Sequence, residues 1–209
     1  LGCGGTISKL SKFNNISVLI VTDSCSTQYK DNYDEMIKKK QNQSFEVSEI
    51  LGVDNYLFGN LPDMKLDSLD SVVINDLIKK SIDDTKADIV FTHHGSDVNK
   101  DHKLIFESTM VATRPINGDV YVEEVYCYEV LSSSEWSFSK FDGFIPNIWI
   151  DIKKQIDIKK SAMKIYDTES KDYPHPRSAK GIQILAQKRG LEVGLKYAEC
   201  FLLVRKTMF

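Results

Sequence analysis

The 209-residue sequence lacks the features that mark secreted, redox-active or membrane proteins. Its four cysteines are scattered and form no Cys-x-x-Cys pair, which argues against a zinc ribbon or a thioredoxin-type site and favours free thiols in a reducing cytoplasm. No apolar run reaches the ~18 residues of a membrane span. The first residues have neither the charged start nor the apolar core of a signal peptide. We therefore expect a cytoplasmic location and no membrane span.

Positive charge is not in excess either. The formal net charge of −3 at pH 7 gives no general attraction to nucleic acid or anionic lipid. The densest basic run, residues 38–40, lies beside acidic residues in an expected helix and is interpreted as a solvated helix face. Internal repeats, low-complexity segments and linkers are lacking as well. We expect a single domain over residues 1–209, long enough for a sizeable core, and no nucleic-acid partner.

Strands alternate with helices along the first half of the chain. Apolar, β-branched runs predict strands, and apolar residues spaced by three and four predict helices, with Gly52 as the C-cap of one of them. This alternation implies right-handed βαβ units and a mostly parallel sheet with helices on both faces, so the fold class is α/β. The expected strands are 16–21, 56–58, 88–92, 120–130, 147–152 and 197–205, and the expected helices are 33–51, 66–77, 103–113, 153–166 and 178–189.

The stretch from Thr92 to His102 carries the densest polar chemistry of the sequence. It joins a strand to a helix, and ligands bind at such connections in open α/β sheets. A calcium loop is disfavoured, because counting from Asp97 the sixth position is His102 instead of Gly and the twelfth is Ser108 instead of Glu. A zinc site stays open, with His102 as the strong ligand and His94 and Asp97 as weaker ones. The alternative that these histidines are loop and helix-cap residues held by hydrogen bonds also stays open.

The segment from His93 to His102 resembles the second signature of the LmbE-like (PIG-L) zinc-dependent deacetylases. Further segments of the chain follow in the order that this family shows, which extends the resemblance over the whole length. These segments are Leu1–Ile7, Val21–Asp23, Ile50–Val53, Phe58–Asp63, Ser133–Trp136, Pro174–Ser178, Arg189–Gly190, Val193–Gly194 and Tyr197–Phe201.

The resemblance implies a Rossmann-like α/β fold with zinc at the carboxyl edge of the sheet. It also implies hydrolysis of the N-acyl group, usually acetyl, of a small-molecule amino sugar or glycoconjugate. In the family, zinc is held by a His and an Asp of a His-Pro-Asp-Asp-Glu signature and by the His that ends the second signature. The first Asp of the same signature acts as the general base. Only the last of these ligands has a counterpart here, and it is His102.

The first signature would precede Leu1. We therefore expect an N-terminally truncated reading frame, without the first strand, two of the zinc ligands and the general base. Because zinc affinity depends on the number and geometry of the ligands, we expect the complete protein to be the enzyme and this chain alone to be inactive. The alternative is a catalytically dead sugar- or nucleotide-binding module of Rossmann-like fold.

The resemblance also assigns roles to single residues. Many relatives carry His three places before the zinc ligand, where this sequence has Asn99, whose amide cannot act as a general acid near pH 7. We expect His175, in a turn between two prolines, to be the general acid, and Asp97, Asn99 and Asp101 to support His102. Trp136 is expected to stack on a sugar face, and a homo-oligomer stays open. The residues expected to contact the sugar hydroxyl groups are Asp23, Asp63, Asp97, Glu135 and Arg177.

Overall fold

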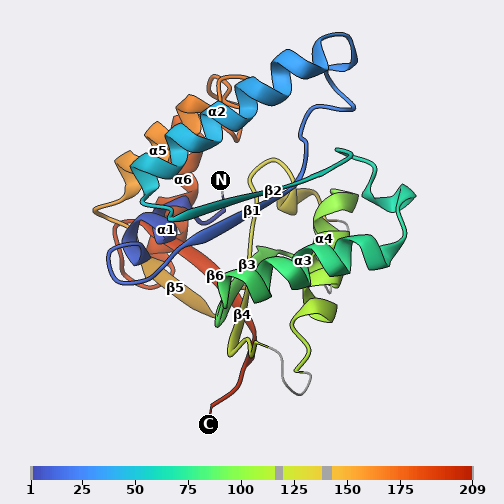
Figure 1. Ribbon diagram of the computed structural model, residues 1–209. Helices are drawn as coiled ribbons and strands as arrows, with labels where there is room; N and C mark the ends of the chain where they lie inside the picture. The colour runs from blue at the N-terminus through green and yellow to red at the C-terminus, as the bar shows by residue number, and fades with distance from the viewer. Residues whose placement is uncertain (1, 116–119, 138–142, 209) are drawn as a thin grey trace.

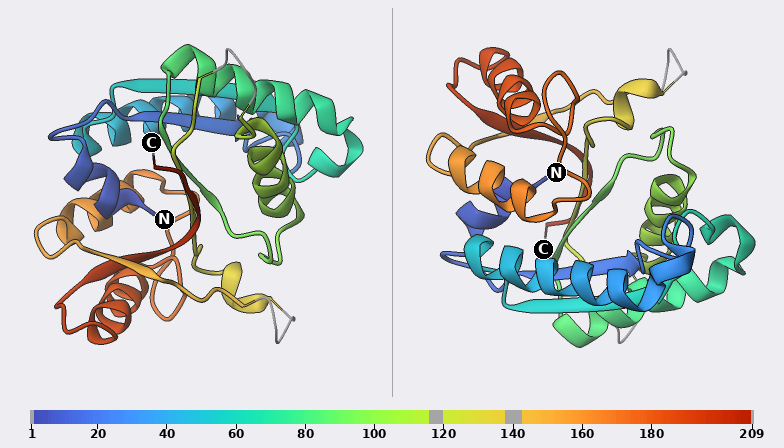
Figure 2. Two further views of the ribbon diagram at one scale, coloured as in Figure 1. Left: turned by 90° about the horizontal axis from the view of Figure 1, so that it is seen from below. Right: turned by 90° about the horizontal axis from the view of Figure 1, so that it is seen from above.

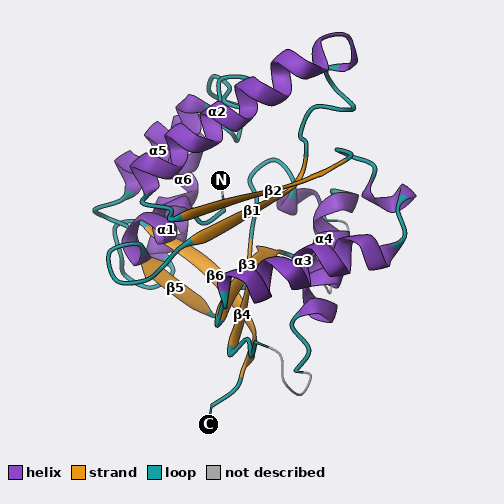
Figure 3. Ribbon diagram, in the orientation of Figure 1, coloured by secondary structure: helices purple, strands orange, loops and turns teal. Residues whose placement is uncertain are grey.

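The chain folds into an α/β structure in which β-strands lie between two groups of helices (Figures 1 and 3). The computed structural model describes residues 2–115, 120–137 and 143–208. The strands are β1 (Ser17–Thr22), β2 (Asn55–Leu61), β3 (Ile89–His93), β4 (Glu124–Tyr128), β5 (Ile148–Asp151) and β6 (Ala198–Lys206). The α-helices are α1 (Gly4–Leu10), α2 (Tyr33–Leu51), α3 (Ser71–Thr85), α4 (Lys100–Ala112), α5 (Ile156–Ile165) and α6 (Ala179–Leu191).

Within the described residues the strands form two sheets. β1 pairs in parallel with β2, and the second sheet has the strand order β3-β4-β6-β5. β3 and β4 run parallel, whereas β6 runs antiparallel to both of its neighbours. The α/β class is confirmed. The strands are partly rather than mostly parallel, because the last strand returns between β4 and β5 in the opposite direction.

One group of helices covers both sheets. α3 and α4 pack against each other, and the core cluster that they share includes Val21 of β1 and Val125 of β4. On the other side, α2 packs against α5, and α1 contacts both of these helices. Figure 2 shows α3 and α4 lying away from α5 and α6 in both views. The strands are thus enclosed by helices, as the sequence pattern predicts.

Local sequence signals explain where the helices begin and end. Gly52 ends α2 with a φ of 75°, and its N–H donates to Ser48 O, which confirms the predicted C-cap. The expected helix from Leu66 is instead a short 3₁₀ turn, Leu66–Ser68, followed by α3. α4 begins three residues earlier than expected because Asn99 caps it. None of the helices in the described ranges is both long and apolar enough to cross a lipid bilayer.

Candidate functional site

The polar segment 94–99 leaves the carboxyl end of β3 and leads into α4. Its conformation is set by hydrogen bonds to its own side chains. The Asn99 side chain accepts a hydrogen bond of 2.9 Å from Asp101 N and caps α4, and Ser96 N donates to His94 Nδ1 over 3.3 Å. A Cβ on Gly95 would lie 2.6 Å from the Phe106 ring, so the segment also packs tightly on α4. The predicted site is therefore a well-defined connection at the carboxyl edge of the strands.

Asp97 is the centre of this segment, with 0% of its surface exposed. Ser134 Oγ donates to Asp97 Oδ2 over 2.7 Å, and Asn99 N donates to Oδ1 over 2.9 Å. Ser133 Oγ also donates to Oδ1, and His102 Nδ1 lies 3.3 Å from the same oxygen. Burial alone would raise the pKa of Asp97, but the hydrogen bonds from these four residues outweigh it and hold the pKa well below its usual range. Asp97 is thus a buried carboxylate that faces protein donors, not solvent.

His102 is held between this carboxylate and the ring of His93. Its ring stacks on that of His93, with centroids 4.1 Å apart and an interplanar angle of 21°. Tyr128 Oη lies 3.4 Å from His93 Nε2. Burial lowers the pKa of His93 to about 3, so this neighbouring imidazole is neutral near pH 7. The Nδ1 atom of His93 is buried and has no hydrogen-bond partner among the residues that the structure describes.

The loop after β4 supplies the two serines that reach Asp97. Glu135 accepts hydrogen bonds from Ser132 N at 2.7 Å and from Ser133 N at 3.0 Å. Ser134 Oγ accepts from Val130 N at 2.8 Å. The carboxylate of Glu135, expected to bind a sugar, therefore shapes the loop that presents the serine hydroxyl groups. Ser133 and Ser134 are the site residues that sequence reasoning missed, and their only signal was their position in the segment that resembles the family.

Two of the residues expected to support His102 have other partners. Asp101 Oδ1 accepts from Leu66 N at 3.2 Å, and burial raises the pKa of this carboxyl group. Asn99 uses its side-chain oxygen for the helix cap. The contact with His102 Nδ1 comes from Asp97, which was expected both to support His102 and to bind substrate. Asp97 is a fully buried side chain that faces protein groups, and its expected contact with a sugar stays a prediction.

The expected substrate residues on the first sheet lie in the loops after β1 and β2. Asp23 is 8% exposed and accepts from Cys25 N and Ser26 N, each at 2.9 Å. Burial would raise the pKa of Asp23, but these backbone hydrogen bonds lower it overall. Asp63 accepts from Thr22 Oγ1 at 3.2 Å, and burial raises its pKa. The two aspartates stand at the carboxyl ends of the neighbouring parallel strands β1 and β2, and their expected contacts with a sugar stay predictions.

The remaining predicted residues lie on segments that follow α5 and β4. His175 Nδ1 accepts from Arg177 N at 3.1 Å, so this recorded hydrogen bond stays within its own turn. The Arg177 guanidinium pairs with Glu169 at 2.5 Å, and Glu169 also pairs with Lys40 of α2 at 2.9 Å. Trp136 is 63% exposed, which leaves its ring free to meet a ligand. The substrate and acid roles of these residues stay predictions.

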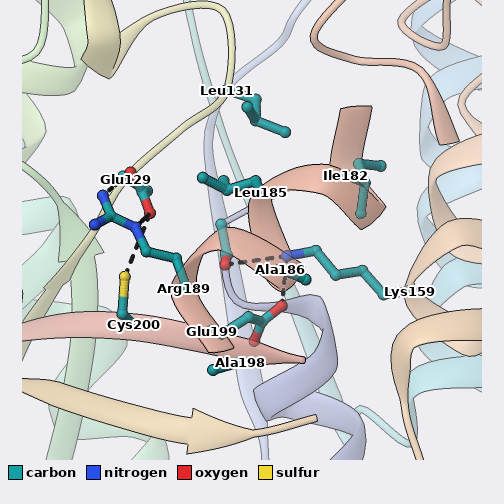
Figure 4. Close-up of a pocket in the computed structure, with 11 residues that line it drawn as sticks. Glu129, Leu131, Lys159, Ile182, Leu185, Ala186, Arg189, Ala198, Glu199 and Cys200 are labelled. Carbon is teal, nitrogen blue, oxygen red and sulfur yellow. Dashed lines mark hydrogen bonds and ion pairs between the residues drawn. The ribbon is translucent and has the colours of Figure 1, made fainter. Parts of the chain in front are cut away.

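A second buried polar cluster lies beside α1 and β6 (Figure 4). Glu199 Oε1 and Oε2 accept from Gly5 N at 2.8 Å and Thr6 N at 2.6 Å, and Lys159 Nζ lies 2.5 Å from Glu199. Arg189 pairs with Glu129 through two hydrogen bonds of 2.6 Å. The cavity between these groups measures about 20 Å³, which is room for about one water molecule and not for a sugar.

This cluster adjoins the histidine stack through Gly2. The Gly2 backbone packs so closely on the Tyr128 ring that a Cβ would overlap it, and Lys159 Nζ donates to Gly2 O at 3.4 Å. Tyr128 in turn contacts His93. Glu199 and Lys159 therefore hold the start of α1 against the side of the candidate site.

A zinc ion was expected at this site. Protein zinc sites usually use three or four protein ligands. Within residues 2–115, 120–137 and 143–208, no three His, Cys, Asp or Glu side chains are placed together so that they could hold a metal ion. His102 offers one ligand atom, Nε2. The described residues alone therefore do not complete a zinc site.

The α/β fold places this polar site at the ends of parallel strands, where ligands bind in open sheets of this class. Comparison with sequence families is more specific. Residues 1–113 match the family model of PIG-L, described as GlcNAc-PI de-N-acetylase. This match covers more than half of the chain, and the protein belongs to the PIG-L family. No curated protein matches the sequence significantly.

Solved structures share the fold over nearly the whole chain. N,N'-diacetylchitobiose deacetylase from Pyrococcus horikoshii has a TM-score of 0.76 and 21% identity, covering 98% of this chain and 78% of its own. The zinc-inhibited form of teicoplanin deacetylase Orf2 has a TM-score of 0.75 and 15% identity, covering 100% and 95%. GalB, the 4-carboxy-2-hydroxymuconate hydratase from Pseudomonas putida KT2440, has a TM-score of 0.77 and 16% identity, covering 100% and 92%. Since a hydratase shares the fold, the chemistry must be argued from the site.

Proposed function

We propose that this protein acts in the hydrolysis of the N-acetyl group of an amino sugar or of its conjugate. The observation that carries the proposal is the assembly of Asp97, His102 and Ser133 at the carboxyl edge of the strands, in a chain of the PIG-L family. This assembly fixes one imidazole and leaves its Nε2 atom for a ligand. The deacetylase activities named for the structures of similar fold support the same reaction class.

Each part of the site has a role in this proposal. Asp97 and Ser133 hold His102, and Tyr128 and His93 form the apolar wall behind it. The loops that carry the carboxylates of Asp23, Asp63 and Glu135 and the guanidinium of Arg177 shape the space for the sugar, and Trp136 stacks on it. We assign Asp101 and Asn99 to the support of the helix that carries His102.

Zinc remains the cofactor that we propose for the reaction, with His102 as one of its ligands. A zinc-inhibited deacetylase of the same fold supports a metal in this family. The described residues bring together no set of three ligands, so no catalytic step is derived from the metal here. The same observation favours a second candidate function, a sugar-binding module without catalysis.

One experiment separates the two functions. The full-length protein is incubated with N-acetylglucosamine and N,N'-diacetylchitobiose, with and without added zinc, while acetate release and sugar binding are measured. Acetate release that disappears in His102→Ala, with an unchanged circular dichroism spectrum, is the result expected for the deacetylase. Sugar binding without acetate release supports the binding module. A protein that neither releases acetate nor binds either sugar would contradict both proposals.

A second variant tests the proposed general acid. Replacing His175 by glutamine is expected to lower kcat for acetate release by about 10²-fold, the lower end of what general acid–base catalysis contributes. KM should change little, because the turn is also shaped by its two prolines and by the pairing of Arg177 with Glu169. Lys171→Gln, an exposed residue nearby, is the control. An unchanged kcat in His175→Gln would remove this residue from the mechanism.

A further inference from the structure

The hydrogen bonds around Asp97 determine which of the neighbouring atoms carry protons. An ionised carboxylate only accepts hydrogen bonds. Asp97 is fully buried, and Asn99 N, which can only donate, lies 2.9 Å from its Oδ1 atom, an arrangement that stabilises the ionised form. Every group that contacts its two oxygen atoms must therefore donate a hydrogen bond. These groups are Ser133 Oγ, Ser134 Oγ, Asn99 N and His102 Nδ1.

The hydrogen bonds of Ser133 agree with this assignment for His102. A serine hydroxyl has one proton to donate. Ser133 donates this proton to Asp97, so its oxygen can only accept from His102 Nδ1, which lies 3.4 Å away. Both neighbours of Nδ1 thus require a proton on that nitrogen. In a neutral imidazole the other nitrogen, Nε2, then carries the lone pair.

The ring also has little freedom to turn. His93 lies parallel to it on one face at 4.1 Å, and Ser133 and Asp97 hold its Nδ1 edge. The serine loop is itself fixed, because Glu135 binds two of its backbone N–H groups. The geometry thus restricts the rotation of His102 as well as the position of its proton.

We propose that Asp97 is the positioning residue of the site, which holds His102 as the Nδ1–H tautomer and presents Nε2 as the free acceptor. Free imidazole in water favours the opposite tautomer, with the proton on Nε2, so the protein has to impose this arrangement. Hydrogen bonds of this kind to the far nitrogen of a histidine set which ring nitrogen is available to a ligand. The importance of this for catalysis rests on the proposed function, but the tautomer itself does not.

The test is a two-bond ¹H–¹⁵N correlation spectrum of the histidine side chains, recorded without substrate and with a metal chelator at a pH where histidine is neutral. In the unmodified protein, His102 is expected to show the ¹⁵N shift of an unprotonated nitrogen at Nε2 and of a protonated one at Nδ1. His102→Gln identifies the signals. A spectrum of the Nε2–H tautomer for His102 would overturn the proposal whether or not the variants of Asp97 and Ser133 fold.

Three variants then assign the cause. Asp97→Asn should shift His102 measurably toward the Nε2–H tautomer, whereas Ser133→Ala should leave the Nδ1–H tautomer in place because the carboxylate remains. Asp88→Asn makes the same change on an exposed residue next to the opposite end of β3 and should have no effect. If folded Asp97→Asn keeps the Nδ1–H tautomer of His102, Asp97 does not set the tautomer. The same holds if only Ser133→Ala loses the Nδ1–H tautomer. These spectra need no activity, so failure of the deacetylase assay does not affect them.

Discussion

Replacing Glu199 by alanine is expected to lower the free energy of unfolding by about 3–5 kcal/mol, the cost of breaking a buried ion pair from one side. Glu199 and Lys159 have only 4% and 8% of their side chains exposed. The change leaves the lysine charge without its partner. It also removes the acceptor of Gly5 N and Thr6 N in the first turn of α1, which has no side-chain cap of its own. Urea denaturation followed by circular dichroism measures the loss.

Two controls show whether the unpaired charge is the cause. Asp67→Ala removes an ion pair with Lys100 in which both side chains are exposed, and it should hardly change the denaturation midpoint. The double variant Glu199→Ala with Lys159→Met should regain part of the lost stability, because it leaves no charge buried alone. If the double variant is less stable than Glu199→Ala, the explanation by an unpaired charge is wrong.

Replacing Phe201 by alanine is expected to cost about 3–5 kcal/mol as well, through the cavity that it leaves. Phe201 is 0% exposed and lies on β6, where it pairs in register with Tyr128 of β4 and Ile148 of β5. Its ring meets Phe91 edge to face at 5.1 Å between centroids. For a chain of this size the loss corresponds to a decrease in Tm of roughly 6–20 °C, which differential scanning calorimetry measures.

The matched control is Phe13→Ala, because Phe13 is 86% exposed. This variant removes the same atoms but should change the stability by less than about 0.5 kcal/mol. Equal Tm values for the two alanine variants would show that β6 is not the centre of the packing that joins β4 to β5.

The sequence predicted the elements well where local chemistry decides them. The glycine at position 52 predicted the end of α2, and β-branched runs predicted β1 and β3. The direction of β6 was not predictable from such patterns, because an apolar strand reads the same in a parallel and an antiparallel pair. The start of α4 was misplaced because the capping role of Asn99 depends on where its side chain points.

The same limit applies to the site. His102 could be selected from the segment that resembles the family, with Asp97, Asn99 and Asp101 as its expected supports, but the sequence did not show which of them contacts the ring. Asp97 and Asp101 are both close to His102 in sequence, and only the fold shows that Asp101 turns toward the backbone of Leu66 while Asp97 turns toward the ring. Ser133 reaches Asp97 across 36 positions of the sequence, a contact that spacing cannot reveal.

The division of the strands into two sheets affects how the protein unfolds. In the part of the chain that the structure describes, no ladder of backbone hydrogen bonds joins β1 and β2 to the other four strands. The two sheets are coupled by side chains, including the apolar cluster that α3 and α4 share with Val21 of β1 and Val125 of β4. Cooperative unfolding of the two sheets therefore depends on dispersion and hydrophobic burial. A weakened α3 interface would let one sheet open while the other keeps its native hydrogen bonds.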